Sequence, residues 1–387
     1  MLIFASMTLF LATQTVQPIF PLYLTEKGAS TFDLGLMVSL ASFTAMATKV
    51  PLGILVGRVG KWRIVPVALF GQSLSLMLYS VVAVPSWFYP IRVFHALVLA
   101  AFAPATIALA SDLAPKGERG DRIGKYLTSF GAATMFGPFL CSLLSGWFDY
   151  TQILRLAATI PLLGLVILVL AGHRMPSSST IKAEEIPDEE KLGPLGSLRE
   201  IVFSRSVFVL SYLRLTFSFT NAFVITLFAL YASEGLLFSP SMIATLFGVK
   251  GITNMIFRFP SGKLSDRIGH RIPLIVSFSL LAVSYLAISE CAEFSMLSIA
   301  MAVHGLAHGM RAVTEWSLLG ESAPSGTSSI ATAYLSTMFS IGEALGALVS
   351  GVVSLVIPIQ TIFRVASLVI LPSAFIPFLI GRKAPQL

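Results

Sequence analysis

Twelve segments of the sequence are each about 20 residues long and largely apolar, and this repetition constrains the fold more than any other feature. A helix needs about 20 mostly apolar residues to cross the hydrocarbon core of a bilayer. We predict spans over 1–24, 32–56, 64–84, 88–111, 123–147, 152–172, 206–232, 240–262, 272–289, 294–319, 329–356 and 361–381. The predicted fold is therefore an all-α polytopic membrane protein.

The composition excludes several other classes of protein. Hydrophobic residues make up 55 % of the 387 residues and charged residues 12 %, whereas about a quarter of the residues of a soluble protein are charged. A soluble fold, a disordered chain and a nucleic-acid-binding protein are excluded, and the net charge of +7 follows membrane topology instead. The two cysteines, Cys141 and Cys291, lie outside any CxxC motif and exclude a disulfide framework.

One long polar stretch, 173–205, separates six predicted spans from the next six. It carries a charge run, prolines and serines, and we interpret it as a cytoplasmic linker with an interfacial helix near 194–202. The predicted domains are a six-helix bundle over 1–172, this linker, and a second bundle over 206–387. The first residues lack a basic region and a small-residue cleavage site, so we interpret them as a span rather than as a signal peptide.

The loops on one side of the predicted membrane carry most of the lysines and arginines. They hold Arg58, Lys61, Arg63, Lys116, Arg119, Arg122, Lys125, Lys263, Arg267 and Arg271, together with the linker. Loops rich in these residues face the cytoplasm. We therefore predict that both termini are cytoplasmic and that the protein lies in the plasma membrane.

The two halves of the chain repeat each other at an offset of 209 positions. The segment 49–60, KVPLGILVGRVG, aligns with the segment 258–269, RFPSGKLSDRIG. The same offset pairs His95 with His304 and Arg155 with Arg364, and no gap is needed between these anchors. Because six is an even number of spans, both halves enter the membrane in the same direction. Parallel six-span repeats of this kind occur in a class of secondary transporters.

These features resemble those of the major facilitator superfamily, and the resemblance covers the whole chain. The motif of that family, G-x-x-x-D-R-x-G-R/K-R/K, follows the second span and recurs in weaker form after the eighth. Here the second copy is the more complete, with Gly262, Asp266, Arg267, Gly269 and Arg271, whereas the first keeps Gly53, Arg58, Gly60 and Lys61. Gly57 stands where the first aspartate belongs. The stretch 112–120, with its DLAP and ERG, also resembles the loop that follows the fourth span in this family.

The resemblance implies two six-helix bundles that give alternating access to a central cavity. It implies a monomer that binds a small-molecule substrate, protons and membrane lipid, with no cofactor and no metal. In this family the motif's aspartate joins a cytoplasmic charge network, so Gly57 implies a weaker latch in the first half. Independently of the family, we expect Gly53, Gly57 and Gly262 to let helices approach closely and Gly60 and Gly269 to form tight turns. The resemblance is uninformative on the cargo, because one scaffold carries many.

Ionisable residues within membrane spans are costly and usually mark a pathway. The basic candidates are Lys49, Arg92, Arg155, Arg214, Lys250, Arg258, Arg311 and Arg364, and the acidic ones are Glu315 and Glu343. We expect Arg155 and Arg364 to snorkel to the outer interface. Lys49 and Arg258 are symmetry mates about 12 Å above the cytoplasmic ends of their helices, and Lys250, Asn254 and Arg258 share one face. These cations favour an anion site; the alternative is a role in packing and gating.

The tenth span carries the clearest polar stripe, formed by His304, His308, Arg311 and Glu315. We predict that Arg311 and Glu315 pair within the helix. The stripe suits proton or substrate handling, because imidazole titrates near neutral pH. A structural role for the histidines is the main alternative, since His304 mirrors His95, and a divalent metal is a weaker one.

Other candidate residues lie in the remaining spans. We predict that Arg92 and His95 take part in proton coupling, and that Glu343 carries protons or forms a static salt bridge with Lys49. Polar side chains of the first and seventh spans complete the candidate substrate site: Gln14, Gln17 and Asn221. The Gly137-Pro138 pair in the fifth span partly resembles a motif of drug–proton antiporters.

The leading functional hypothesis is a secondary transporter of a small anionic or polar organic solute, coupled to protons. The alternative is a multidrug efflux drug/proton antiporter, which is disfavoured because cationic drugs call for acids and bases outnumber them here. A membrane-embedded enzyme is disfavoured more strongly, since the chain has no HExxH motif, paired carboxylates or nucleophile elbow. A non-transporting sensor is also disfavoured, because we would expect it to carry a soluble domain, and this sequence contains none.

Overall fold

The computed structural model describes residues 2–112, 119–170, 204–322 and 328–379, and these fold almost entirely into helices. Seven helices belong to the first half: α1 (Leu2–Val16), α2 (Phe20–Glu26), α3 (Thr31–Val59), α4 (Lys61–Val81), α5 (Phe88–Asp112), α6 (Arg119–Leu144) and α7 (Tyr150–Leu170). The second half contains α9 (Arg205–Leu230), α10 (Pro240–Ile268), α11 (Arg271–Glu290), α12 (Phe294–Ser322), α13 (Ser328–Val353) and α14 (Ile359–Ile370). No strand occurs in these residues, and the predicted linker and interfacial helix lie outside them.

The described helices form twelve membrane spans, as the sequence predicts. Eight of them are long and apolar enough to cross a bilayer by themselves. A ninth span consists of α1 and α2, which meet at a bend of 50°, where Pro18 and Pro21 remove backbone donors. The last span continues from α14 through the 3₁₀ turns η4 (Leu371–Ala374) and η5 (Ile376–Leu379). The remaining three spans, α6, α10 and α12, are less apolar, and two of them carry the candidate site residues.

The boundaries of the helices reproduce the offset of 209 positions. Helices α3 and α10 begin and end 209 residues apart, and so do α6 and α13. Helix α7 corresponds in the same way to the whole stretch from α14 to η5. The backbone also turns in the same way after α3 and α10, because Gly60 has φ +98° and Gly269 has φ +79°. These are left-handed values that favour glycine, so the predicted tight turns are confirmed.

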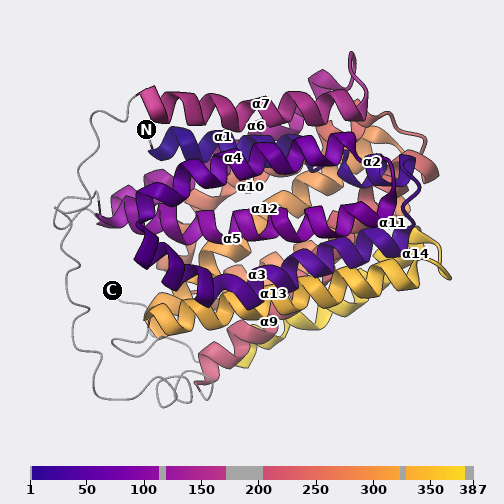
Figure 1. Cartoon of the computed structure of the whole chain (residues 1–387). Helices are drawn as coiled ribbons and strands as arrows, with labels where there is room; N and C mark the ends of the chain where they lie inside the picture. Colours follow the sequence, from indigo (N-terminus) through magenta and orange to yellow (C-terminus); the bar gives the residue numbers. More distant parts are fainter. Residues whose placement is uncertain (1, 113–118, 171–203, 323–327, 380–387) are drawn as a thin grey trace. The chain divides into compact units, whose positions relative to one another are not determined.

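The contacts within the chain divide it into two compact units. The first comprises residues 1–182 and 232–248, and the second comprises 183–231 and 249–387. In the first unit α1 packs against α6 and α7, and α4 packs against α5 and α7 (Figure 1). In the second unit α9 packs against α13 and α14, and α11 packs against α12 and α14. Each pairing in the second unit is the repeat of one in the first.

One boundary between the units falls at 182/183, within the linker predicted from the sequence, and a short stretch of the second half, 232–248, also belongs to the first unit. The first part of α10 belongs to the first unit because hydroxyl groups connect it to α6: Ser142 Oγ lies 2.9 Å from both Ser241 Oγ and Thr245 Oγ1. Ala244 adds an apolar contact with Cys141 and Ile153. The start of α10 thus packs with the first unit, whereas the rest of α10 packs with the second.

The glycines at which helices approach closely are mostly not the ones that the sequence predicts. A Cβ atom added to Gly53 or Gly57 would have no neighbour within 4 Å, so the expectation for these two residues is wrong, and Gly262 only approaches the side chain of Val313 at 3.3 Å. The tightest crossings lie elsewhere. A Cβ on Gly346 of α13 would lie 2.1 Å from the Phe219 carbonyl oxygen of α9. Backbone-to-backbone packing of this kind, typical of membrane helices, fixes the helices that carry the site.

Candidate functional site

The candidate site lies in the second unit, where α9 and α12 present matching polar faces to each other. Arg214, Phe217 and Asn221 follow each other at i, i+3 and i+7 along α9, and His308, Arg311 and Glu315 have the same spacing along α12. Residues so spaced share one face of a helix. The two faces touch through aromatic contacts, since the Phe217 ring lies 4.8 Å from the His308 ring.

A buried cluster of three charges joins these two helices. Arg311 pairs with Glu315 one turn further along α12, so the predicted pair within this helix is confirmed. Arg214 of α9 donates from Nη1 to the same carboxylate oxygen, Oε2, at 3.1 Å. The exposed fractions are 9 % for Arg214, 2 % for Arg311 and 1 % for Glu315. Two cations thus share one anion in a desolvated place, and the cluster keeps one excess positive charge.

Aromatic rings flank both guanidinium groups. The Arg311 guanidinium lies 3.6 Å from the centre of the Phe217 ring. Arg214 lies over the Trp316 ring at 4.3 Å and over the Phe339 ring at 5.6 Å. The negative face of an aromatic ring attracts a cation and stabilises it by about 0.5–2 kcal/mol. These rings hold the two arginines in position without neutralising their charge.

Several buried polar atoms of this cluster have no hydrogen-bond partner. They are Nε of Arg214, Nε of Arg311, Oε1 of Glu315 and Oδ1 of Asn221. A buried polar atom without a partner costs about 1–3 kcal/mol. The cluster thus retains unused donors beside its excess positive charge, which is the chemistry required to bind a further anion.

The predicted stripe of α10 lies in the same unit and partly connects within itself. Arg258 Nε donates to Asn254 Oδ1 at 3.1 Å, and Lys250 is half-buried one turn before Asn254. This helix crosses α12 closely, since a Cβ on Gly305 would lie 2.2 Å from the Lys250 carbonyl oxygen. The charges of Lys250, Arg258 and Arg311 all act on His308. The cations of α10 and α12 therefore share one electrostatic environment.

The polar stripe of α12 divides between two neighbours. His308 and Arg311 face α9, whereas His304 is fully buried and contacts α11, where its Nδ1 lies 3.2 Å from Ser284 Oγ. The Ser284 hydroxyl donates its proton to the Leu281 carbonyl at 2.7 Å, so it can only accept from His304. His304 therefore donates from Nδ1, and its buried position supports the structural alternative.

The first unit holds a corresponding polar chain around His95. The Thr13 hydroxyl donates to the Leu9 carbonyl, so it accepts from Gln72 Nε2 at 3.0 Å. This orients the Gln72 amide, whose Oε1 lies 2.8 Å from His95 Nε2. His95 is therefore a donor through Nε2, and the chain ties α1, α4 and α5 together.

Among the other candidates of the first unit, Arg92 lies near enough to His95 for its charge to act on that residue. Arg92 Nε donates to the Met37 carbonyl at 3.4 Å, and its guanidinium lies 5.7 Å from the Phe20 ring. Gln14 packs against Gly137 of α6, where an added Cβ atom would lie 2.6 Å from Gln14 Cβ, and Gln17 lies in the turn between α1 and α2. Lys49 is half-buried in α3, and Glu343 is half-buried in α13 of the other unit, so their proposed pairing stays a prediction.

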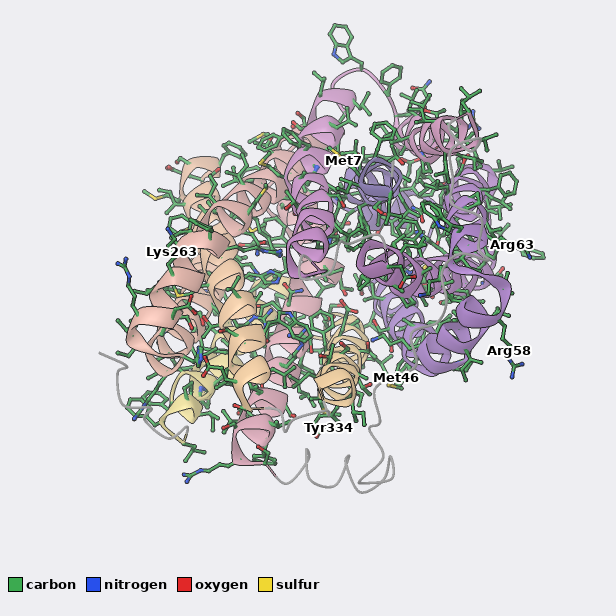
Figure 2. The ribbon with its side chains drawn as sticks, turned by 90° about the vertical axis from the view of Figure 1, so that its left-hand side faces the viewer. Met7, Met46, Arg58, Arg63, Lys263 and Tyr334 are labelled. Carbon is green, nitrogen blue, oxygen red and sulfur yellow. The ribbon has the colours of Figure 1, made fainter. Side chains whose placement is uncertain are left out.

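The residues of the repeated motif lie at the ends of α3 and α10. Arg58, Asp266 and Arg267 are exposed, and the Arg58 side chain points away from its bundle (Figure 2). Arg271 lies over the Phe378 ring at 4.2 Å. Although Gly57 replaces the first aspartate, Lys61 Nζ forms an ion pair with Asp112 at 2.6 Å. The first half therefore keeps a charge contact at this end by another route.

Arg214 is the residue for which the sequence predicts no role. Its membrane position is visible in the sequence, but its partner lies 101 residues away on α12. The spacing of seven residues between Arg214 and Asn221 is the one signal that relates it to the candidate list. No group of three or more His, Cys, Asp or Glu side chains in the described part of the chain is arranged to hold a metal ion.

Comparison with known proteins agrees with this architecture. The Major Facilitator Superfamily profile matches the chain twice, over residues 2–236 and 212–387. An uncharacterised MFS-type transporter of Methanocaldococcus jannaschii is 19 % identical over 93 % of this chain and 92 % of its own length. A multi-drug resistance efflux pump of Streptococcus pneumoniae, PmrA, is 23 % identical over 91 % of this chain and 88 % of its own.

A solved structure shares the fold over nearly the whole chain. It is a bacterial homologue of the human lysosomal transporter Spinster, in an inward-facing and occupied conformation. The TM-score is 0.78 and the identity 13 %, covering 98 % of this chain and 95 % of that one. The chain belongs to the Major Facilitator Superfamily. It is a multi-pass membrane transporter for a small molecule and not an enzyme.

Proposed function

We propose that this chain moves a small anionic organic solute across the plasma membrane by alternating access, coupled to protons. The observation that carries the proposal is the charge of the spans in the second unit. Arg214, Lys250, Arg258 and Arg311 stand against Glu315 and Glu343, which leaves two excess positive charges. An unbalanced charge inside a membrane is costly, and a bound anion lowers that cost.

The same spans contain the acids that can couple transport to protons. A carboxylate within a span changes its charge when its cation is taken over by a ligand, and it then favours the protonated form. Glu315 and Glu343 are the acids available for this role. We place both termini in the cytoplasm on the basis of the loop charges, and we propose that the monomer is the working unit.

A second candidate function is multidrug efflux by proton antiport. The observation that favours it is the 23 % identity to the pump PmrA over 91 % of this chain. Cationic drugs need acids in the cavity, and the candidate site has an excess of bases. We therefore rank this function below anion transport.

Transport by the purified protein in liposomes distinguishes anion transport from multidrug efflux. The panel comprises radiolabelled acetate, benzoate and inorganic phosphate, a neutral sugar, and the cationic dye ethidium, each tested with and without a pH gradient. We expect gradient-dependent transport of one or more anions and none of ethidium. Ethidium transport without any anion transport would establish the second function, and transport of the sugar alone would remove both.

A further inference from the structure

The hydrogen bonding of Glu315 is the starting point. Arginine usually binds a carboxylate through two parallel N–H···O bonds, one to each oxygen. Here both guanidinium groups donate to Oε2, and Oε1 has no partner. Each arginine has five N–H donors, and Nε of both Arg214 and Arg311 is unused. Glu315 therefore leaves N–H donors of both arginines unused, and these donors can bind the carboxylate of a ligand.

The surroundings restrict the kind of anion. Phe217, Trp316 and Phe339 lie against the two guanidinium groups at 3.6–5.6 Å. Such rings suit a ligand whose charged group is attached to an apolar or aromatic body. Glu315 presents a single carboxylate to the two arginines, so a ligand that replaces it needs one carboxylate.

We propose that Arg214 and Arg311 form a binding centre for an apolar or aromatic monocarboxylate, with Glu315 as a built-in counter-ion that the incoming carboxylate displaces. This inference rests on the proposed function and identifies the substrate class and the coupling residue of that site. Glu315 holds the two cations while the site is empty. The substrate takes over their N–H donors when it binds.

Displacement couples the substrate to a proton. Glu315 is 1 % exposed, and a lone carboxylate in such an apolar place is far more costly than the neutral acid. Once its arginines bind the substrate, Glu315 therefore takes up one proton on a carboxylate oxygen. The charge balances, because one anion and one proton enter together and the cluster stays at its original charge.

The experiment measures binding of benzoate and uptake of protons on the same purified full-length samples. Isothermal titration gives the affinity, and a pH dye in weakly buffered detergent solution gives the protons bound per benzoate. We expect about one proton per benzoate for the unchanged protein. Glu315→Gln removes the competing charge, so it should bind benzoate at least tenfold more tightly and without the uptake of one proton per benzoate.

The matched control is Glu290→Gln, because Glu290 is an acid of the same unit that pairs with Arg364 in an exposed place. It should leave benzoate affinity and proton uptake unchanged.

A single Arg214 variant can fail to fold, since Glu315 would lose a partner, so the double variant Arg214→Gln/Glu315→Gln is the better test. It should bind benzoate at least tenfold more weakly than Glu315→Gln alone.

The outcomes separate this inference from the proposed function. Equal benzoate affinity in the unchanged protein, Glu315→Gln and the double variant would overturn the binding centre while leaving anion transport intact. Binding of benzoate without proton uptake would overturn the role of Glu315. Binding of inorganic phosphate but not of benzoate would overturn the substrate class. If no anion of the transport panel binds the unchanged protein, the proposed function falls as well.

Discussion

Lys61 and His270 occupy equivalent places in the two halves, and each contacts the carboxylate that lies 51 residues further along the chain. Lys61 Nζ lies 2.6 Å from Asp112, and His270 Nε2 lies 3.1 Å from Glu321. Both contacts join the start of one helix, α4 or α11, to the end of the next, α5 or α12. The repeat thus preserves the contact although the residues that make it differ.

Each contact should make a small contribution to stability. Lys61, Asp112 and Glu321 are partly exposed, and ion pairs of this kind contribute about 1 kcal/mol or less. We therefore expect that removing either Lys61 or Asp112 costs about as much stability as removing both, because each change abolishes the same contact.

The measurement is a double-mutant cycle of melting temperatures in detergent. We expect Lys61→Ala, Asp112→Ala and the double variant to melt at similar temperatures, slightly below the unchanged protein. Additive losses in the double variant would contradict the pairing.

A second prediction concerns the crossing of α10 and α12. Gly305→Ala places a Cβ atom 2.2 Å from a backbone oxygen of Lys250, and only a shift of the helix can relieve that contact. Overpacking of this kind costs about 1–3 kcal/mol. The matched control is Gly320→Ala in the same helix, because nothing lies within 4 Å of the added atom there.

Thermal unfolding of the two alanine variants decides the matter. Gly305→Ala should melt several degrees below the unchanged protein, and Gly320→Ala should melt at or slightly above it, since alanine favours helix. Equal melting temperatures would show that the crossing is looser than the described geometry.

The span pattern was predictable because a bilayer imposes a length and an apolarity on every helix. The 209-residue offset, which relates α3 to α10 and α6 to α13, was visible because an even number of spans keeps each pair at the same depth. The glycine contacts were not, since a glycine in a sequence does not reveal its neighbour. A Cβ atom added to Gly53, in the family motif, would have no neighbour within 4 Å, whereas one added to Gly346 would meet the backbone of α9.

The candidate site was predictable within one helix but not between helices. The pairing of Arg311 with Glu315 follows from their spacing of four residues. The contribution of Arg214 depends on which face of α9 is turned towards α12. The packing of α9 against α12 and α13 decides that orientation, and the sequence does not reveal it. For the same reason the sequence placed His304 with His308 on one stripe, although the structure directs them towards different helices.

A third prediction uses the tautomers of the two buried histidines. The hydrogen bonds assign a donor at Nδ1 of His304 and at Nε2 of His95. The amide nitrogen of asparagine lies near the place of Nδ1, and that of glutamine lies near the place of Nε2. We therefore expect His304→Asn to be milder than His304→Gln, and His95→Gln to be milder than His95→Asn, each by about 1 kcal/mol, the contribution of one hydrogen bond.

Melting temperatures of the four variants, together with the pH profile of transport, test this. A structural role moves stability and leaves the pH profile of transport in place. A shifted pH profile in His304→Asn at unchanged stability would instead return this residue to proton coupling. Reversed preferences for asparagine and glutamine would refute the tautomers.

The last prediction concerns Lys49 and Arg258, which the sequence places at equivalent depth on α3 and α10. If both act on the anion, Lys49→Ala or Arg258→Ala should weaken its binding by about 1.5–3 kcal/mol, the scale of a hydrogen bond to a charged group. That corresponds to about ten- to a hundredfold in affinity. Lys49→Arg and Arg258→Lys should have smaller effects, although Arg258→Lys loses the geometry of a planar guanidinium.

The structure adds a control for this prediction, because Arg258 Nε donates to Asn254 Oδ1. Asn254→Ala removes that bond but leaves the positive charge in place. An electrostatic role predicts that Asn254→Ala weakens anion binding far less than Arg258→Ala does. A packing role predicts the same loss of melting temperature in both variants and an unchanged affinity in the folded fraction. Measuring affinity and melting temperature on the same detergent-purified samples separates the two roles, since charge acts on the first quantity and packing on the second.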